Sequence, residues 1–194
     1  WASCMVASGD ADGAVTGNTR RFGASLEKIK QVVNARVGEI MFGLNLVVHK
    51  GKTIFVGDTS VHEYPNAEQM SEMAISAARV VRLFGFEPKV AFVSHSTFGQ
   101  PLTARTKHIK DAVEILKKKN VNFQFDGDMQ PDVALNEEYK SLYPFSKIVG
   151  NANILIMPGQ HSAAISYKMM KTLGDTKVIG PLLIGLGLPI EIAP

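Results

Sequence analysis

Residues 90–99 read VAFVSHSTFG, an apolar run that ends in a loop of small and polar side chains. Such a run predicts a buried strand of a parallel sheet. Two further stretches have the same order, FQFDGDMQ at 123–130 and ILIMPGQH at 154–161. Ligands of open α/β sheets bind beyond the carboxyl ends of the strands. We therefore expect the three loops to form one composite site.

Helical patterns alternate with these strands. Asn66 and Gln69 form a capping-box pattern ahead of an apolar stripe that reaches Phe84. Other helices are expected at 25–37, 109–116, 133–139 and 161–173, and other strands at 13–17, 40–48, 53–56, 178–184 and 190–192. The alternation predicts an α/β fold with three layers, α/β/α, in which a mostly parallel sheet is interrupted by one β-hairpin around Gly51.

The composition is that of a globular chain with a substantial core, since 45% of the 194 residues are hydrophobic. No apolar run reaches the roughly 18 residues that span a bilayer, and the first residues lack the pattern of a signal peptide. The single cysteine, Cys4, excludes an internal disulfide and fits a reducing compartment. A net charge of +3 gives no field that would capture nucleic acid. We expect a soluble cytoplasmic protein with neither a nucleic-acid nor a membrane partner.

Common catalytic motifs are absent from the sequence, which has no phosphate-binding loop, dinucleotide fingerprint, nucleophile elbow or His-Glu-x-x-His metal helix. The acidic residues of 10–12 and of 126–132 offer oxygen ligands that a hard cation prefers. Caps of helices and turns explain the same residues, so we expect no metal site. Ser94 and Ser96 should share one side of the chain while His95 faces away, which favours a hydrogen-bonding cradle over a nucleophile.

Five stretches, in this order along the chain, resemble the phosphate acetyltransferase and butyryltransferase family. They are 9–17 (GDADGAVTG), 67–88, 93–96, 126–129 and 180–186 (GPLLIGL). The resemblance covers nearly the whole chain. Within the family, 94–99 and 146–166 are most similar to the carboxy-terminal phosphotransacetylase-like domain of bacterial hybrid NADP-dependent malic enzymes.

The resemblance implies the fold of phosphotransacetylases, which is similar to that of isocitrate and isopropylmalate dehydrogenases and has a coenzyme A cleft between two domains. Residues 1–19 and 178–194 would supply strands to a first subdomain that is mostly absent, and residues 20–177 would form a second α/β subdomain. The strand expected at 190–192 stops just before Pro194. We therefore expect a fragment of a longer polypeptide.

The resemblance also implies a regulatory role. Such a domain is expected to assemble a homo-oligomer and to bind acetyl-CoA, an allosteric inhibitor of the malic enzyme, without catalysing a reaction itself. NADP, a divalent Mg or Mn ion and the oxidative decarboxylation of malate to pyruvate would belong to a malic enzyme domain outside this chain. The candidate acetyl-CoA-binding residues are Arg20, Arg21, Ser94, His95, Ser96, Asp126, Gly159 and Gln160. The two arginines suit phosphate groups because guanidinium forms forked hydrogen bonds.

Two other interpretations stay open. The chain can be an active phosphate acetyltransferase or butyryltransferase that exchanges an acyl group between coenzyme A and phosphate. Against this, Glu27 stands where active members of the family carry a phosphate-facing arginine, and its charge would repel an anionic substrate. The third interpretation is a structural dimerisation module that binds no coenzyme A.

Overall fold

The structure, a computed structural model, describes residues 1–101 and 103–193. Its helices are α1 (Ala2–Ser8), α2 (Phe22–Lys30), α3 (Ala67–Leu83), α4 (Ala104–Lys118), α5 (Pro131–Leu135), α6 (Glu137–Lys140) and α7 (Gln160–Leu173). Its strands are β1 (Ala14–Gly17), β2 (Phe42–His49), β3 (Lys52–Gly57), β4 (Lys89–Val93), β5 (Gln124–Met129), β6 (Ile154–Ile156), β7 (Thr176–Ile184) and β8 (Ile190–Ala193). None of the described helices combines the length and the apolar character that crossing a bilayer requires.

Six strands form the main sheet, in the order β5-β4-β6-β3-β2-β7. β5, β4, β6 and β3 pair in parallel, whereas β2 runs antiparallel to both of its neighbours, β3 and β7. Within the described sheet, five strands therefore share one direction and β2 opposes them. The mostly parallel sheet and the β2–β3 hairpin that the sequence predicts are both confirmed.

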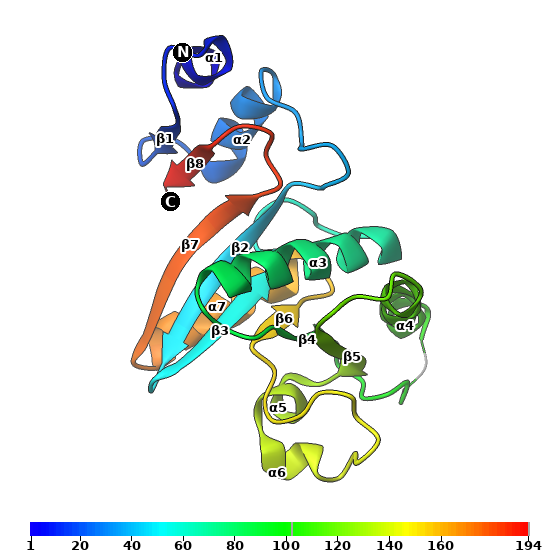
Figure 1. The fold of residues 1–194 in the computed structure, drawn as a ribbon. Helices are drawn as coiled ribbons and strands as arrows, with labels where there is room; N and C mark the ends of the chain where they lie inside the picture. Colours follow the sequence, from blue (N-terminus) through cyan, green and yellow to red (C-terminus); the bar gives the residue numbers. More distant parts are fainter. Residues whose placement is uncertain (102, 194) are drawn as a thin grey trace.

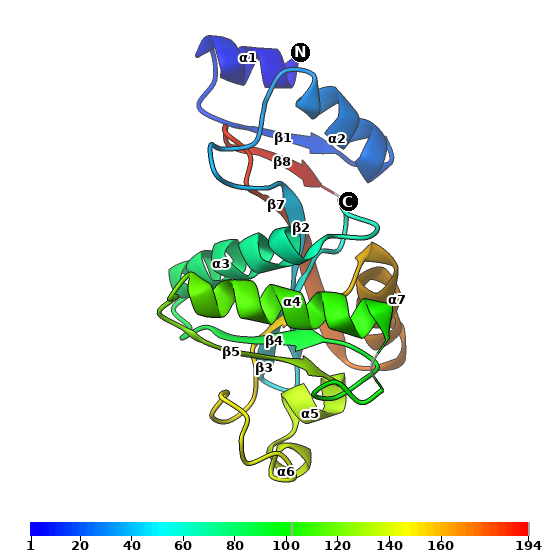
Figure 2. The ribbon, with the colours of Figure 1, turned by 90° about the vertical axis from the view of Figure 1, so that its right-hand side faces the viewer.

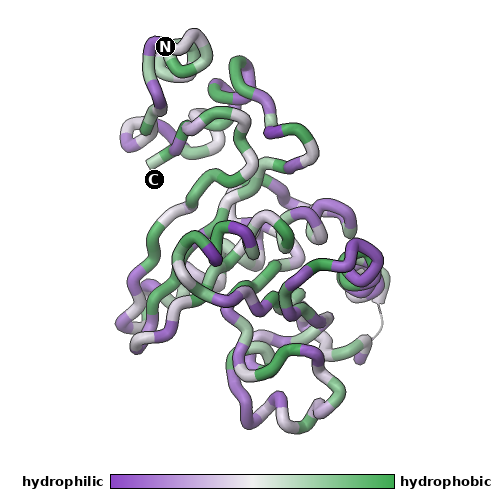
Figure 3. Tube along the Cα trace, viewed as in Figure 1, coloured by the Kyte–Doolittle hydropathy of each residue, from purple (hydrophilic) through white to green (hydrophobic). Residues whose placement is uncertain are grey.

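Helices cover both faces of the main sheet (Figure 1). On one face, α3 and α4 pack on a core that contains Phe42, Phe55 and Phe92. On the other face, α5 and α7 cover a second core that contains Val56 and Met157. Figure 3 shows hydrophobic residues along much of the sheet and mostly hydrophilic residues along α4. The predicted three-layer α/β/α architecture is therefore present, while the more distant likeness to the dehydrogenases stays a prediction.

α3 begins as the sequence predicts. The Asn66 side chain accepts a hydrogen bond from the Gln69 N–H, and the Gln69 side chain accepts one from the Asn66 N–H, both at 2.8 Å. This capping box satisfies two donors at the helix end. Thr103 and Thr106 form a similar box at the start of α4. Both boxes fix where the chain turns from a loop into a helix behind the carboxyl end of a strand.

A smaller unit unites the two ends of the chain. β1 and β8 pair in parallel as a separate two-stranded sheet, and α2 contributes Leu26 and Ile29 to their core. Figure 2 shows α1 and α2 beside this small sheet at one end of the molecule. The strand expected at 13–17 is present as β1. The expectation that this strand is buried is wrong, because Val15 is 75% exposed. The division of the chain into subdomains at residues 19 and 178 stays a prediction.

Two segments connect the small unit to the main sheet, residues 31–41 and residues 185–189. They are hydrogen-bonded to each other. The Arg36 N–H donates to the Gly185 carbonyl at 2.8 Å, and the Gly187 N–H donates to the Asn34 carbonyl at 2.9 Å. The two crossings therefore run side by side.

Candidate functional site

The carboxyl ends of β3, β4, β5 and β6 meet at one edge of the main sheet, because these strands are parallel neighbours. We call it the carboxyl edge, defined by the loops that begin at Asp58, Ser94, Gln130 and Met157. It is the edge at which the sequence predicts a composite site. Buried polar side chains gather there.

Ser94 and Ser96 are the centre of a buried hydrogen-bond network in the loop after β4. Their Oγ atoms are 3.0 Å apart and His95 between them is exposed, so the predicted alternation is confirmed. The Ser96 hydroxyl donates to Asp128 Oδ2, and the Gly99 N–H donates to Asp128 Oδ1 at 2.9 Å. Ser96 and Asp128 are 0% and 1% exposed. The network therefore holds the loop after β4 against the end of β5.

Asp126 and Asp128 have different surroundings. Residues 126–129 belong to β5 rather than to the loop expected after Phe125, so that expectation is wrong, while the role of Asp126 in acetyl-CoA binding stays a prediction. The Asp126 carboxylate lies inside the strand, where it accepts hydrogen bonds from the N–H groups of Gly127 at 3.0 Å and Lys147 at 2.8 Å. It is 8% exposed and has no contact with the two serines. The candidate carboxylate of this loop is therefore Asp128.

A bulge at Gly127 explains why Asp128, and not Asp126, reaches the loop after β4. Phe92 of β4 pairs with Gly127 and Val93 pairs with Met129, so Asp128 has no partner in β4. Gly127 has a φ of +153°, and a Cβ atom there would lie 2.8 Å from the Phe92 carbonyl oxygen. Only glycine fits this backbone conformation and this close approach. The bulge frees Asp128 to reach the loop after β4, and the sequence pattern alone does not reveal it.

A second polar cluster, which the sequence analysis missed, lies in the loop after β3. Asp58 is 0% exposed. Its carboxylate accepts hydrogen bonds of 2.7 to 3.0 Å from the backbone N–H groups of Gly43, Ser60, Val61 and His62. His62 Nδ1 is also 2.7 Å from Asp58 Oδ2, which assigns the proton to Nδ1 because a carboxylate only accepts. Asp58 therefore holds the whole loop in one conformation.

The signal for this cluster was present in the sequence. Residues 54–56 read IFV and residues 57–60 read GDTS, again an apolar run followed by small and polar residues. The rule that selected the other three loops selects this one too.

The loop after β6 packs on the loop after β3. The Gln160 N–H donates to the His62 carbonyl at 3.1 Å. A Cβ atom on Gly159 would lie 2.3 Å from the Glu63 carbonyl oxygen, so no side chain fits between the two loops at this position. His161 Nε2 is 3.4 Å from Glu63 Oε1, and the His161 side chain is 72% exposed. The structure therefore brings Gly159 and Gln160 to the Asp58 cluster.

Arg20 and Arg21 lie apart from these loops, at the start of α2 in the small unit. Both are exposed. Arg20 lines a hollow of about 340 Å³ together with Lys28, Ser25 and Thr16, among others. Two basic side chains and four Ser or Thr residues give this hollow the chemistry of an anion site. Within the described chain, no hydrogen bond or ion pair joins either arginine to the carboxyl edge.

The chemistry available at the carboxyl edge follows from its donors and acceptors. The two fully buried carboxylates, Asp58 and Asp128, already accept hydrogen bonds from the chain itself. The Ser96 hydroxyl is buried and donates to Asp128, so it is not exposed to attack a substrate. In residues 1–101 and 103–193, no group of three or more His, Cys, Asp or Glu side chains is placed to hold a metal ion. The edge suits ligand binding by preformed loops rather than covalent catalysis.

Comparisons with known proteins agree on one family. The family model described as phosphate acetyl/butaryl transferase matches residues 1–194. An NADP-dependent malic enzyme of Rhizobium meliloti (strain 1021) is 42% identical over 193 residues, which cover 100% of this chain and 25% of that protein. A phosphate acetyltransferase of Bacillus subtilis (strain 168) is 29% identical and covers 98% of this chain and 60% of its own length.

A solved structure gives the same result. A phosphotransacetylase from Streptococcus pyogenes has a TM-score of 0.89 at 28% identity, and the match covers 97% of this chain and 58% of that one. The chain thus spans about a quarter of the malic enzyme that it matches and more than half of the phosphotransacetylase.

Proposed function

Because this chain belongs to the phosphate acetyl/butaryl transferase family, we propose that it is the phosphotransacetylase-like regulatory part of an NADP-dependent malic enzyme. In this role it binds acetyl-CoA as an allosteric inhibitor and helps to assemble a homo-oligomer. Malate oxidation and decarboxylation, NADP and the divalent metal would belong to the rest of the polypeptide. The observation that carries the proposal is the higher identity to the malic enzyme than to the phosphate acetyltransferase.

The geometry of the carboxyl edge supports ligand binding. Its loops are held by hydrogen bonds within the chain, so a ligand would meet a surface that is already organised and costs little to order. The acyl end of acetyl-CoA would lie at the loops of Ser94 and Gly159, and its phosphates would lie at Arg20 and Arg21. Inhibition then requires only that acetyl-CoA binds one state of the assembly more tightly than another.

The proposed self-association has a candidate surface on α7. Ile165, Met169 and Leu173 are spaced four residues apart and are 59%, 54% and 80% exposed, which gives one apolar stripe on the outer face of the helix. A second copy seated on this stripe would cover it by a symmetric contact.

The test is a calorimetric titration of the full-length natural protein with acetyl-CoA, with assays of malate oxidation and of acetyl phosphate formation on the same preparation. Arg20→Ala combined with Arg21→Ala should weaken acetyl-CoA binding at least several-fold, because the forked donors to phosphate are lost. Lys50→Ala combined with Lys118→Ala removes the same charge from exposed positions elsewhere and should leave the affinity unchanged. Equal affinity of the arginine variant and the native protein would remove both arginines from the site.

An active phosphate acyltransferase is the second candidate, favoured by the similarity to the solved phosphotransacetylase. The Glu27 side chain is 72% exposed and 3.7 Å from Lys30, so its charge is partly balanced within α2. Acetyl phosphate formation at ordinary enzymatic rates would establish this activity and contradict the regulatory proposal. Absence of acetyl-CoA binding at every concentration would instead favour a purely structural module.

A further inference from the structure

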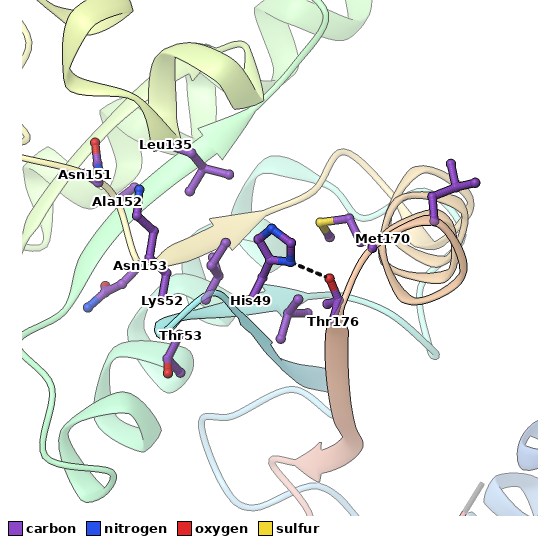
Figure 4. Close-up of a pocket in the computed structure, with 13 residues that line it drawn as sticks. His49, Lys52, Thr53, Leu135, Asn151, Ala152, Asn153, Met170 and Thr176 are labelled. Atoms are coloured by element: carbon purple, nitrogen blue, oxygen red, sulfur yellow. Dashed lines mark hydrogen bonds between the residues drawn. The ribbon is translucent and has the colours of Figure 1, made fainter.

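A cavity opens at the opposite edge of the main sheet, where the parallel strands begin. Its volume of about 620 Å³ lies within the range of roughly 300 to 1,000 Å³ typical of small-molecule sites. It is enclosed by α5, α7 and the end of the β2–β3 hairpin (Figure 4). None of the acetyl-CoA candidates lines it. This amino-edge cavity is therefore separate from the carboxyl edge.

The walls of the amino-edge cavity are aliphatic. They are formed by Val47, Ile54, Leu135, Ala152, Met170 and Leu173. The cavity exists because α5 is a helix of five residues that ends at Leu135, which leaves the sheet face between α5 and α7 incompletely covered. No Phe, Tyr or Trp side chain lines it among the described residues, so the walls suit an aliphatic chain.

Polar groups line the cavity at the hairpin. They come from His49 and Lys52. Thr53 also lines the cavity, but its side chain points away from Lys52, because successive side chains of a strand alternate between the two faces of the sheet (Figure 4). His49 Nδ1 is 2.8 Å from Thr176 Oγ1 and 3.3 Å from the Asp175 carbonyl oxygen, contacts that orient the imidazole ring (Figure 4). In the part of the chain that the structure describes, the Lys52 ammonium has no ion-pair partner. A cation thus stands beside an aliphatic wall.

The lining of the cavity carries a positive charge and no negative one among the described residues. No Asp or Glu side chain lines the cavity among the described residues. The Asn151 side chain adds an amide whose Oδ1 atom has no hydrogen-bond partner in the described chain. This oxygen accepts hydrogen bonds, so the group of the lining that suits an anion is the Lys52 ammonium, which pairs with a carboxylate.

We propose that the amino-edge cavity binds a medium-chain aliphatic carboxylate, with the hydrocarbon chain along the apolar walls and the carboxylate at Lys52. This site is independent of acetyl-CoA binding at the carboxyl edge. Its test therefore has its own ligands and variants, and it can fail or succeed whatever the outcome there.

The test titrates the full-length natural protein with octanoate and with methyl octanoate, which has the same chain without the charge. Octanoate should bind saturably, and methyl octanoate about fivefold more weakly, because a partly exposed ion pair is lost. Lys52→Gln should lower the affinity for octanoate by a similar factor and leave that for methyl octanoate unchanged. The matched control is Lys50→Gln, which neutralises the exposed lysine on the same hairpin outside the lining and should have no effect.

Leu135→Trp fills the cavity and should abolish binding of both ligands, with circular dichroism to show that the fold is kept. If this variant does not fold, Lys52→Glu, at an exposed position, should repel octanoate and spare methyl octanoate. The proposal is overturned if octanoate shows no saturable binding up to about 10 mM, or if a folded Leu135→Trp variant still binds it. It is also overturned if Lys50→Gln and Lys52→Gln weaken binding equally.

Discussion

The two edges of the main sheet differ in the hydrogen-bond partners of their buried charged groups. At the carboxyl edge, Asp58 and Asp128 are fully buried, and donors of the chain surround each carboxylate. Towards the amino edge, Lys140 is 7% exposed and its ammonium has no hydrogen-bond partner in the described chain. Burial lowers the pKa of Lys140; the nearby charge of Glu137 partly opposes this, and that of Lys89, the first residue of β4, lowers the pKa further. The buried carboxylates of the carboxyl edge are hydrogen-bonded, whereas the buried ammonium towards the amino edge is not.

The largest expected effect tests the carboxyl edge. Asp58→Ala removes the acceptor of four backbone N–H groups and should lower the free energy of unfolding by about 3 kcal/mol. Urea denaturation measures the change. The control is Asp132→Ala, because this exposed carboxylate accepts a hydrogen bond only from the adjacent Val133 N–H in the described chain, at 2.9 Å. Similar losses in both variants would show that the carboxyl edge is not organised by Asp58.

The second prediction compares one methionine at each edge. Met157 is 4% exposed and lies directly after β6. Met157→Ala should lower the free energy of unfolding by about 3 kcal/mol. Met170 lines the amino-edge cavity and is partly exposed, so its side chain packs against fewer atoms. Met170→Ala should therefore lower the free energy of unfolding by only about 1 kcal/mol. Chemical denaturation of both variants gives the two values. Equal losses would mean that the cavity is closed in solution.

The smallest effect concerns the unpaired ammonium. A lysine whose pKa is lowered by folding destabilises the folded state at pH values below that pKa, and the cost disappears as the pH rises to the ordinary lysine value. Lys140→Met should therefore stabilise the protein by up to about 1 kcal/mol at pH 7 and by less at pH 10. Denaturation at both pH values is the measurement, and Lys147→Met, at an exposed position, is the control. Destabilisation by Lys140→Met at pH 7 would show that the ammonium has a partner in solution.

Local patterns predicted most of the fold. The capping box of Asn66, the hairpin around Gly51 and the alternation of Ser94 with Ser96 each depend on neighbours in the sequence, and each is confirmed. The family resemblance is confirmed over the whole chain. These features depend on contacts between residues that are close along the chain, which a sequence displays directly.

Contacts between distant residues account for what the sequence did not show. Asp128, and not Asp126, reaches the loop after β4 because β5 pairs with β4 through a bulge, and this pairing joins residues more than thirty positions apart. The amino-edge cavity depends on how far α5 extends over the sheet, which its composition does not encode. The Asp58 cluster is different, since the pattern that selected the other three loops, an apolar run followed by small and polar residues, also selects the loop after β3.

The side-by-side crossings at residues 31–41 and 185–189 make a single joint between the small unit and the main sheet. The Gly43 N–H, just beyond the first crossing, donates to Asp58 at 2.9 Å, and the Leu183 N–H, just before the second, donates to Glu191 of β8 at 2.9 Å. A rotation of the small unit against the main sheet would therefore have to strain both crossings at once, and with them the hydrogen bond between Gly43 and the loop of Asp58.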